Sequence, residues 1–129
     1  MSNDASYADD EELVGQFIDW TSDAVREMRE IVDALPDQEP ADSGKADRLH
    51  DLAHNIKGMG SSFNFQLMTE IGLSFCVYLK GLNETLGKRV AESHVRAFEV
   101  VLQNRITGDG GEKGKALVGR LAEIVREEG

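Results

Sequence analysis

The predicted fold is decided by one stretch of the chain, Leu49-His50-Asp51-Leu52-Ala53-His54-Asn55-Ile56-Lys57-Gly58-Met59-Gly60-Ser61-Ser62-Phe63-Asn64-Phe65. Residues three, four and seven apart share one face of an α-helix, because a turn takes about 3.6 residues. One face is apolar: Leu49, Leu52, Ala53, Ile56, Met59, Gly60 and Phe63. A second face is polar: His50, His54, Lys57, Gly58 and Ser61. We therefore predict an amphipathic helix that packs by the first face and presents the second to solvent or to a partner.

The rest of the chain is predicted to form four further helices, because apolar residues recur there at the same spacing. Loops are expected at 36–44, 83–87 and 107–111, where glycine, proline and polar residues gather. The five predicted helices span about residues 9–35, 43–64, 66–82, 88–106 and 112–128. Asp42 or Ser43 is expected to cap the second helix. Its end is open between a sharp turn at Asn64 and a helix that continues through Phe65.

No segment alternates apolar and polar residues between turns, as a half-buried strand would. We therefore predict an all-α fold, an antiparallel up-and-down bundle with a four-helix core and an additional helix. Residues 1–129 are expected to form one domain, with residues 1–8 as a flexible tail. Phe17 and Trp20 lie on the apolar face of the first helix and are both predicted to be core residues.

The charge and the cysteine count exclude several functions. A net charge of −10 is opposite in sign to what nucleic acids and anionic membranes attract, so neither is an expected partner. No run approaches the roughly 20 apolar residues of a transmembrane helix. Cys76 is the only cysteine, which rules out an intrachain disulfide and favours a reduced, cytoplasmic setting. A monomer is expected.

The order His54-x-x-Lys57-Gly58, within residues 52–65, resembles the signature of histidine phosphotransfer (HPt) domains. These helical carriers take a phosphoryl group from an aspartate of one receiver domain and pass it to another. The resemblance implies a stand-alone phosphorelay carrier with His54 as the phosphoacceptor. It implies response-regulator receiver domains and a sensor or hybrid histidine kinase as partners. It also implies that the chain has no cofactor of its own, since Mg²⁺ is held by the partner receiver.

Imidazole suits phosphoryl carriage because it is a nucleophile near neutral pH when one nitrogen is unprotonated. Phosphoryl transfer depends mainly on positioning and charge stabilisation. Lys57, one turn beyond His54, is expected to stabilise the phosphoryl oxygens, and Gly58 to leave room for the partner. A glycine inside a helix costs about 1 kcal/mol relative to alanine. Close packing against the first or third helix is the expected reason for Gly60.

Four polar residues near His54 are predicted to contact the partner: His50, Asn55, Ser61 and Ser62. Three nearby cations (Lys45, Arg48 and Lys57) outnumber the aspartates of residues 43–62 by one. This comparatively positive strip is expected to orient the acidic pocket of a receiver. Relatives often hold the histidine ring with a glutamine or glutamate of the third helix. Here Glu70 is the nearest carboxylate, so water or a backbone carbonyl is the alternative.

Other interpretations remain open beside this one. His50 is the rival phosphoacceptor, although no Lys-Gly follows it at the required spacing. His50 and His54 have the spacing of a metal-binding pair, but no third ligand is evident, so no metal site is predicted. His94 falls in no motif. The alternative function is a non-phosphorylated helical adaptor that docks receiver or kinase domains.

A histidine kinase dimerisation hairpin is the third interpretation. Such hairpins usually carry an acidic residue after the histidine, where Asn55 stands here. Gly108, Gly110 and Gly111 lack the lysine and serine of a P-loop. A phosphocarrier is therefore favoured over an autonomous enzyme.

Overall fold

The computed structural model describes residues 10–128 and confirms the all-α fold. The helices are α1 (Glu11–Asp33), α2 (Lys45–Gly60), α3 (Gln66–Lys80), α4 (Lys88–Asn104) and α5 (Gly111–Glu128), with a 3₁₀ turn at Ser61–Phe63. The flexible tail expected at residues 1–8 lies outside the described residues.

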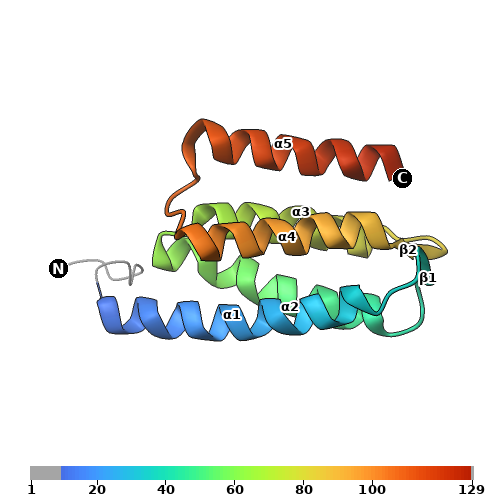
Figure 1. Ribbon diagram of the computed structural model, residues 1–129, viewed down its shortest axis with the longest axis horizontal. Helices are drawn as coiled ribbons and strands as arrows, with labels where there is room; N and C mark the ends of the chain where they lie inside the picture. Colours follow the sequence, from blue (N-terminus) through green and yellow to red (C-terminus); the bar gives the residue numbers. More distant parts are fainter. Residues whose placement is uncertain (1–9, 129) are drawn as a thin grey trace.

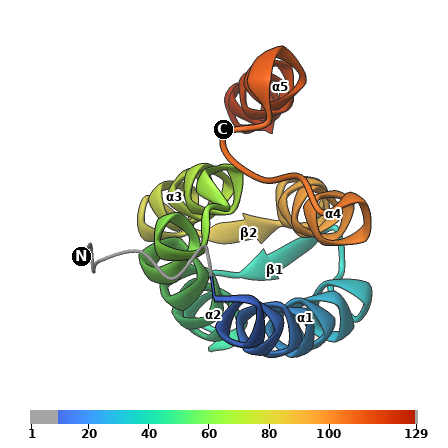
Figure 2. The same cartoon turned by 90° about the vertical axis from the view of Figure 1, so that its left-hand side faces the viewer.

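Four of these helices enclose the core and the fifth lies outside it. Figure 1 shows the five helices running along the long axis of the molecule, and Figure 2 looks along that axis. In the end-on view α1, α2, α3 and α4 surround a common interior, while α5 lies outside it and packs mainly against α3 and α4. This is the predicted four-helix core with an additional helix. α2 and α3 form the most extensive helix pair, so the polar face of α2 stands on a firmly packed hairpin.

A short β-ribbon closes one end of the bundle, where the sequence predicts only loops. Strands β1 (Gln38–Pro40) and β2 (Thr85–Gly87) pair antiparallel, with Glu39 opposite Leu86. Three-residue strands leave almost no alternating pattern in the sequence. They form because the two loops meet at the same end of the bundle (Figure 1). The expectation that residues 36–44 and 83–87 are loops was wrong in part, because each contains one of these strands.

The core is built from the predicted apolar faces, with two exceptions. Phe17 of α1 stacks on Phe63 with ring centroids 4.6 Å apart and also contacts Phe65. Trp20 and Met59, both predicted to face inward, are instead 38% and 40% exposed. Each lies at the edge of its helical face, where neighbouring helices decide whether the side chain is covered.

The turn between α2 and α3 is sharp. Asn64 adopts a left-handed conformation (φ 65°, ψ 33°), which decides the alternative left open by the sequence. Asparagine tolerates this conformation better than most residues do. At the other end of α2, Gly44 (φ 95°) is the N-cap, so neither Asp42 nor Ser43 takes the predicted cap position, although the Ser43 hydroxyl accepts a hydrogen bond from the Lys45 backbone N–H at 3.3 Å.

Candidate functional site

The polar face of α2 is placed as the sequence predicts. His54, Gly58 and Ser61 are exposed, whereas His50 and Lys57 are half-buried on the side nearer α3. Leu52 and Ile56, from the opposite face, are buried in the core. The structure thus separates the two faces and presents His54 on an open surface.

The rings of His54 and His50 lie side by side. Their centroids are 5.9 Å apart and the ring planes differ by 11°. Within residues 10–128, no protein group forms a hydrogen bond with the His54 ring, and Glu70 is not among its partners. A ring-holding side chain on α3 is therefore not part of this site, and both ring nitrogens of His54 are available to a reactant.

Lys57 lies at a close approach between α2 and α3. A Cβ added to Gly72 of α3 would come within 3.0 Å of the Lys57 Cβ, so only glycine fits there without movement. The Thr69 hydroxyl donates to the Lys57 carbonyl at 3.0 Å. Within the described chain the Lys57 ammonium has no ion pair. The Lys57 backbone is thus held against α3, while the Lys57 ammonium group is available to bind an anion that is not part of the described chain.

Three glycines near His54 have different reasons to be glycine. A Cβ at Gly60 would lie 2.5 Å from Thr69 Oγ1 and 2.8 Å from the Phe65 carbonyl oxygen, which confirms close packing against α3. Gly72 faces the backbone of Ala53 and Lys57. A Cβ added at Gly58 would meet no atom within 4 Å. Packing among residues 10–128 therefore does not require Gly58 to be glycine.

The other predicted contact residues surround His54 unevenly. Asn55 and Ser61 are exposed, while Ser62 is half-buried. The Ser61 hydroxyl lies 3.4 Å from the Thr69 hydroxyl, which ties it to α3. Asn55 and Ser61 can thus contact a partner directly, and Ser62 contributes less surface.

The positive strip predicted along α2 is narrower than expected. Arg48 pairs with Glu27 of α1 at 2.7 Å, and Lys45 pairs with Glu39 at 3.5 Å. These carboxylates come from other elements, so local sequence could not reveal the pairing. Only Lys57 of the three cations keeps its charge uncompensated within residues 10–128.

Sequence reasoning missed a cation on the neighbouring helix. Thr69, Leu73, Cys76 and Lys80 recur at helical spacing and form what we call the α3 border row. The row begins at Thr69, which contacts Lys57 and Ser61 of α2, and the positive charge of Lys80 at its other end acts on His50. The spacing was visible in the sequence, but the side of α3 that meets α2 was not.

Exposed apolar residues lie on the helices around His54. On α3, Leu73 of the border row is 50% exposed, whereas Val77, which is 64% exposed, lies on the side of α3 that faces α5. On the other side of His54, Trp20 is seven residues from Glu27 on α1, and Met59 is eleven residues from Arg48 on α2. Since Glu27 pairs with Arg48, these spacings place Trp20 and Met59 along the same α1–α2 border. All four exposed large apolar residues of the described chain lie on α1, α2 or α3.

The third histidine, His94 of α4, is a core residue. Its Nδ1–H donates to the Val90 carbonyl at 2.8 Å, and its Nε2 accepts from the Ser74 hydroxyl at 2.8 Å. The ring stacks on Phe75 with centroids 4.8 Å apart and is fully buried. Burial lowers the pKa of His94, so the ring is neutral at pH 7. Both nitrogens are used in packing and neither is available for chemistry.

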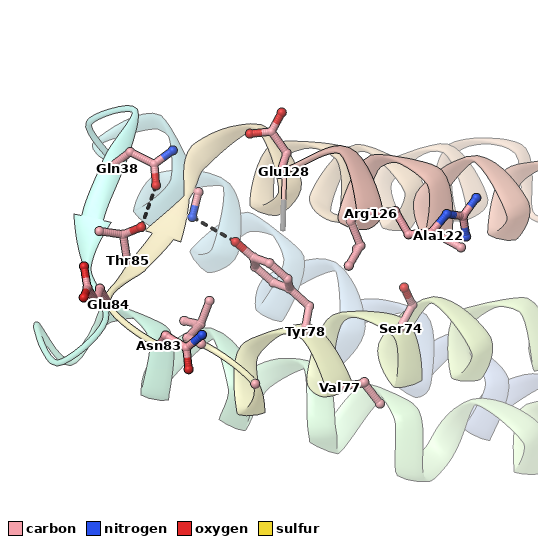
Figure 3. A pocket seen from close by; sticks show the side chains of 14 residues that line it. Gln38, Ser74, Val77, Tyr78, Asn83, Glu84, Thr85, Ala122, Arg126 and Glu128 are labelled. Carbon is pink, nitrogen blue, oxygen red and sulfur yellow. Dashed lines mark hydrogen bonds between the residues drawn. The ribbon is translucent and has the colours of Figure 1, made fainter.

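A cleft of about 850 Å³ lies away from His54. It is bounded by the C-terminal halves of α3 and α5 and by the β-ribbon (Figure 3). Tyr78 stands at its centre, where its hydroxyl accepts from the Gly87 backbone N–H at 2.9 Å. None of its described lining residues comes from α2. The candidate site at His54 thus lies apart from this cleft, on the exposed face of α2.

Comparisons with protein-family models, with curated proteins and with solved structures found no match. Within residues 10–128, no three His, Cys, Asp or Glu side chains are grouped so that they could hold a metal ion. No helix in that range has the length and apolar character needed to cross a membrane.

Proposed function

We propose that the chain is a histidine phosphotransfer protein that accepts a phosphoryl group on His54 from a receiver-domain aspartate and passes it to another receiver. The observation that carries this proposal is the exposed His54 ring, whose two nitrogens form no hydrogen bond within residues 10–128, beside a Lys57 without an ion pair and the open space over Gly58 in the same range. A structural histidine needs none of these features, as His94 illustrates.

The chemistry requires little from this side of the complex. An unprotonated ring nitrogen of His54 attacks phosphorus, the new N–P bond forms, and the P–O bond to the aspartate carboxylate breaks. The reverse exchange delivers the group to the next aspartate. Lys57 stabilises the charge on the phosphoryl oxygens. The Mg²⁺ and the remaining charged groups belong to the acidic pocket of the receiver.

The surface around His54 is suited to docking such a partner. The absence of a side chain at Gly58 lets the receiver pocket approach the ring. Trp20 and Met59 on one side and Leu73 on the other offer apolar contacts that flank the polar strip. We place the carrier in the cytoplasm, as a monomer that meets its receivers and a sensor or hybrid histidine kinase one at a time.

The proposal is tested by transfer of labelled phosphate from a Mg²⁺-loaded, phosphorylated receiver domain to the wild type, His54→Gln and His50→Gln. We expect acid-labile label on the wild type and on His50→Gln, and none on His54→Gln. Circular dichroism of the three proteins checks that all are folded.

Two results would reject the proposal. Label retained by His54→Gln would place the acceptor at His50 or elsewhere. Absence of label on the wild type, with receiver binding intact, would show that the same surface serves a helical adaptor without phosphotransfer.

A further inference from the structure

The register between α2 and α3 places the end of α3 beside His50. Gly60 of α2 faces Thr69 of α3, and Lys57 of α2 faces Gly72 of α3. Moving back by three residues along α2 therefore corresponds to moving forward by three residues along α3. Continuing this antiparallel register by two more turns aligns His50 with the last turn of α3. The α3 border row therefore ends next to the His50–His54 ring pair.

Lys80 is the cation at that end. Its positive charge acts on His50, and the charges of Lys80 and Lys57 both act on the buried Cys76 between them. Within the described chain Lys80 has no ion pair. Two uncompensated ammonium groups, one from each helix, thus border the imidazole pair in a chain of net charge −10.

His50 responds to this surrounding charge. Partial burial lowers the pKa of His50, and the like charges of both helices add to the effect. The charged groups facing it are Lys80 of α3 and Asp51, His54 and Lys57 of α2, of which only Asp51 raises its pKa. On the α1 side, Glu27 and Arg48 neutralise each other. His50 is therefore neutral at pH 7 while the site is empty.

We propose that His50 and Lys80 complete the phosphoryl-binding site, with His50 taking up a proton when His54 is phosphorylated and then donating a hydrogen bond to the phosphoryl group. This inference rests on the proposed function of His54. A phosphoryl group adds up to two negative charges beside a ring whose centroid is 5.9 Å from that of His54. The proton comes from solvent and returns to it when the phosphoryl group leaves. His50 itself forms no bond to phosphorus.

Proton binding by His50 and phosphorylation of His54 are linked equilibria, so each must favour the other by the same factor. We expect His50 to bind its proton about tenfold more tightly in the phosphorylated protein, from a Coulomb interaction across this distance. Protonation of His50 then stabilises the phosphohistidine by the same factor.

The test is an NMR titration of the histidine rings in the full-length chain before and after treatment with phosphoramidate. This reagent transfers its phosphoryl group to an imidazole nitrogen with loss of ammonia, so no receiver takes part. The variants are Lys80→Gln and, as a matched control, Lys113→Gln, an exposed lysine of α5. His54→Glu supplies a fixed negative charge at the same position without any reagent.

In the free protein we expect Lys80→Gln to raise the pKa of His50, because a like charge is removed, and Lys113→Gln to leave it unchanged. Phosphorylation of His54, and the His54→Glu substitution, are each expected to raise the pKa of His50. The inference would be overturned if the pKa of His50 stayed constant both on phosphorylation of His54 and in His54→Glu. Phosphoramidate labelling of His50 itself would also overturn it. Failure of transfer from receivers would reject the proposed function and leave these titrations unaffected.

Discussion

On α2 the His54 imidazole is exposed beside one parallel ring, whereas on α4 the His94 imidazole is fully buried and bonds through both nitrogens. Both are histidines on amphipathic helices of one bundle. The difference lies in what the neighbouring helices supply: Ser74 and Phe75 of α3 cover His94, while nothing from α1 or α3 covers His54. A buried imidazole with both nitrogens hydrogen-bonded contributes to stability, whereas an exposed imidazole without such bonds is available for reaction.

This comparison predicts that the two histidines separate stability from function. The largest stability effect is expected for His94→Ala, which leaves a cavity beside Phe75 and an unpaired Ser74 hydroxyl. We expect a loss of about 3 kcal/mol in the free energy of unfolding, measured by urea denaturation. His50→Ala is the control and should change stability by no more than about 0.5 kcal/mol. Equal losses in the two variants would contradict the distinction.

The same contrast exists between two glycines of α2. Gly60→Ala would force the new methyl group against the Phe65 carbonyl and the Thr69 side chain. We expect it to destabilise the protein by about 2 kcal/mol, because the start of α3 must move. Urea unfolding of Gly60→Ala, Thr69→Ala and the double variant tests whether a clash with the Thr69 side chain causes this loss of stability. Removal of the Thr69 side chain should relieve only part of the loss, since the backbone contact remains.

A pH dependence of stability follows from His94. Burial lowers its pKa in the folded chain, whereas the unfolded chain titrates at about pH 6.5. Below this pH the unfolded state binds a proton that the folded state excludes, so stability falls by up to about 1.4 kcal/mol per pH unit. Urea midpoints should therefore drop between about pH 7 and pH 5.5 in a His50→Gln background. His94→Gln should show a flatter profile, and an equally steep one would assign the effect to other groups.

The smallest effect is expected at Gly58, and its sign is opposite to that at Gly60. Gly58 is exposed with open space around it, so Gly58→Ala should stabilise the protein by about 1 kcal/mol through helix propensity alone. Gly58→Leu should be labelled by phosphoramidate as fast as the wild type but should accept phosphate from a receiver more slowly. Unchanged transfer rates in Gly58→Leu would mean that this position does not face the partner.

The features that could be predicted from the sequence are those set within one helix. The two faces of α2 follow from helical spacing, and the turn at Asn64 follows from its tolerance of left-handed geometry. The bundle follows from five amphipathic segments. Exposure of His54 was also predicted, because it lies opposite the apolar face.

The features that were missed depend on contacts between distant segments. The β-ribbon needs two loops to meet, and the pairing of Arg48 with Glu27 needs α1 beside α2. Trp20 is exposed because no neighbouring helix covers that edge of α1. Lys80 joins the site only through the register that Gly60 and Gly72 impose, which helical periodicity alone does not specify.

The proposed function is that this chain carries phosphate between receivers through His54. The most direct measurement follows labelled phosphate from one phosphorylated receiver domain to a second, unphosphorylated one with Mg²⁺ present. We expect label to reach the second receiver only when the wild-type chain is added, and not with His54→Gln. Label that reaches the second receiver equally well with His54→Gln would contradict the proposed function.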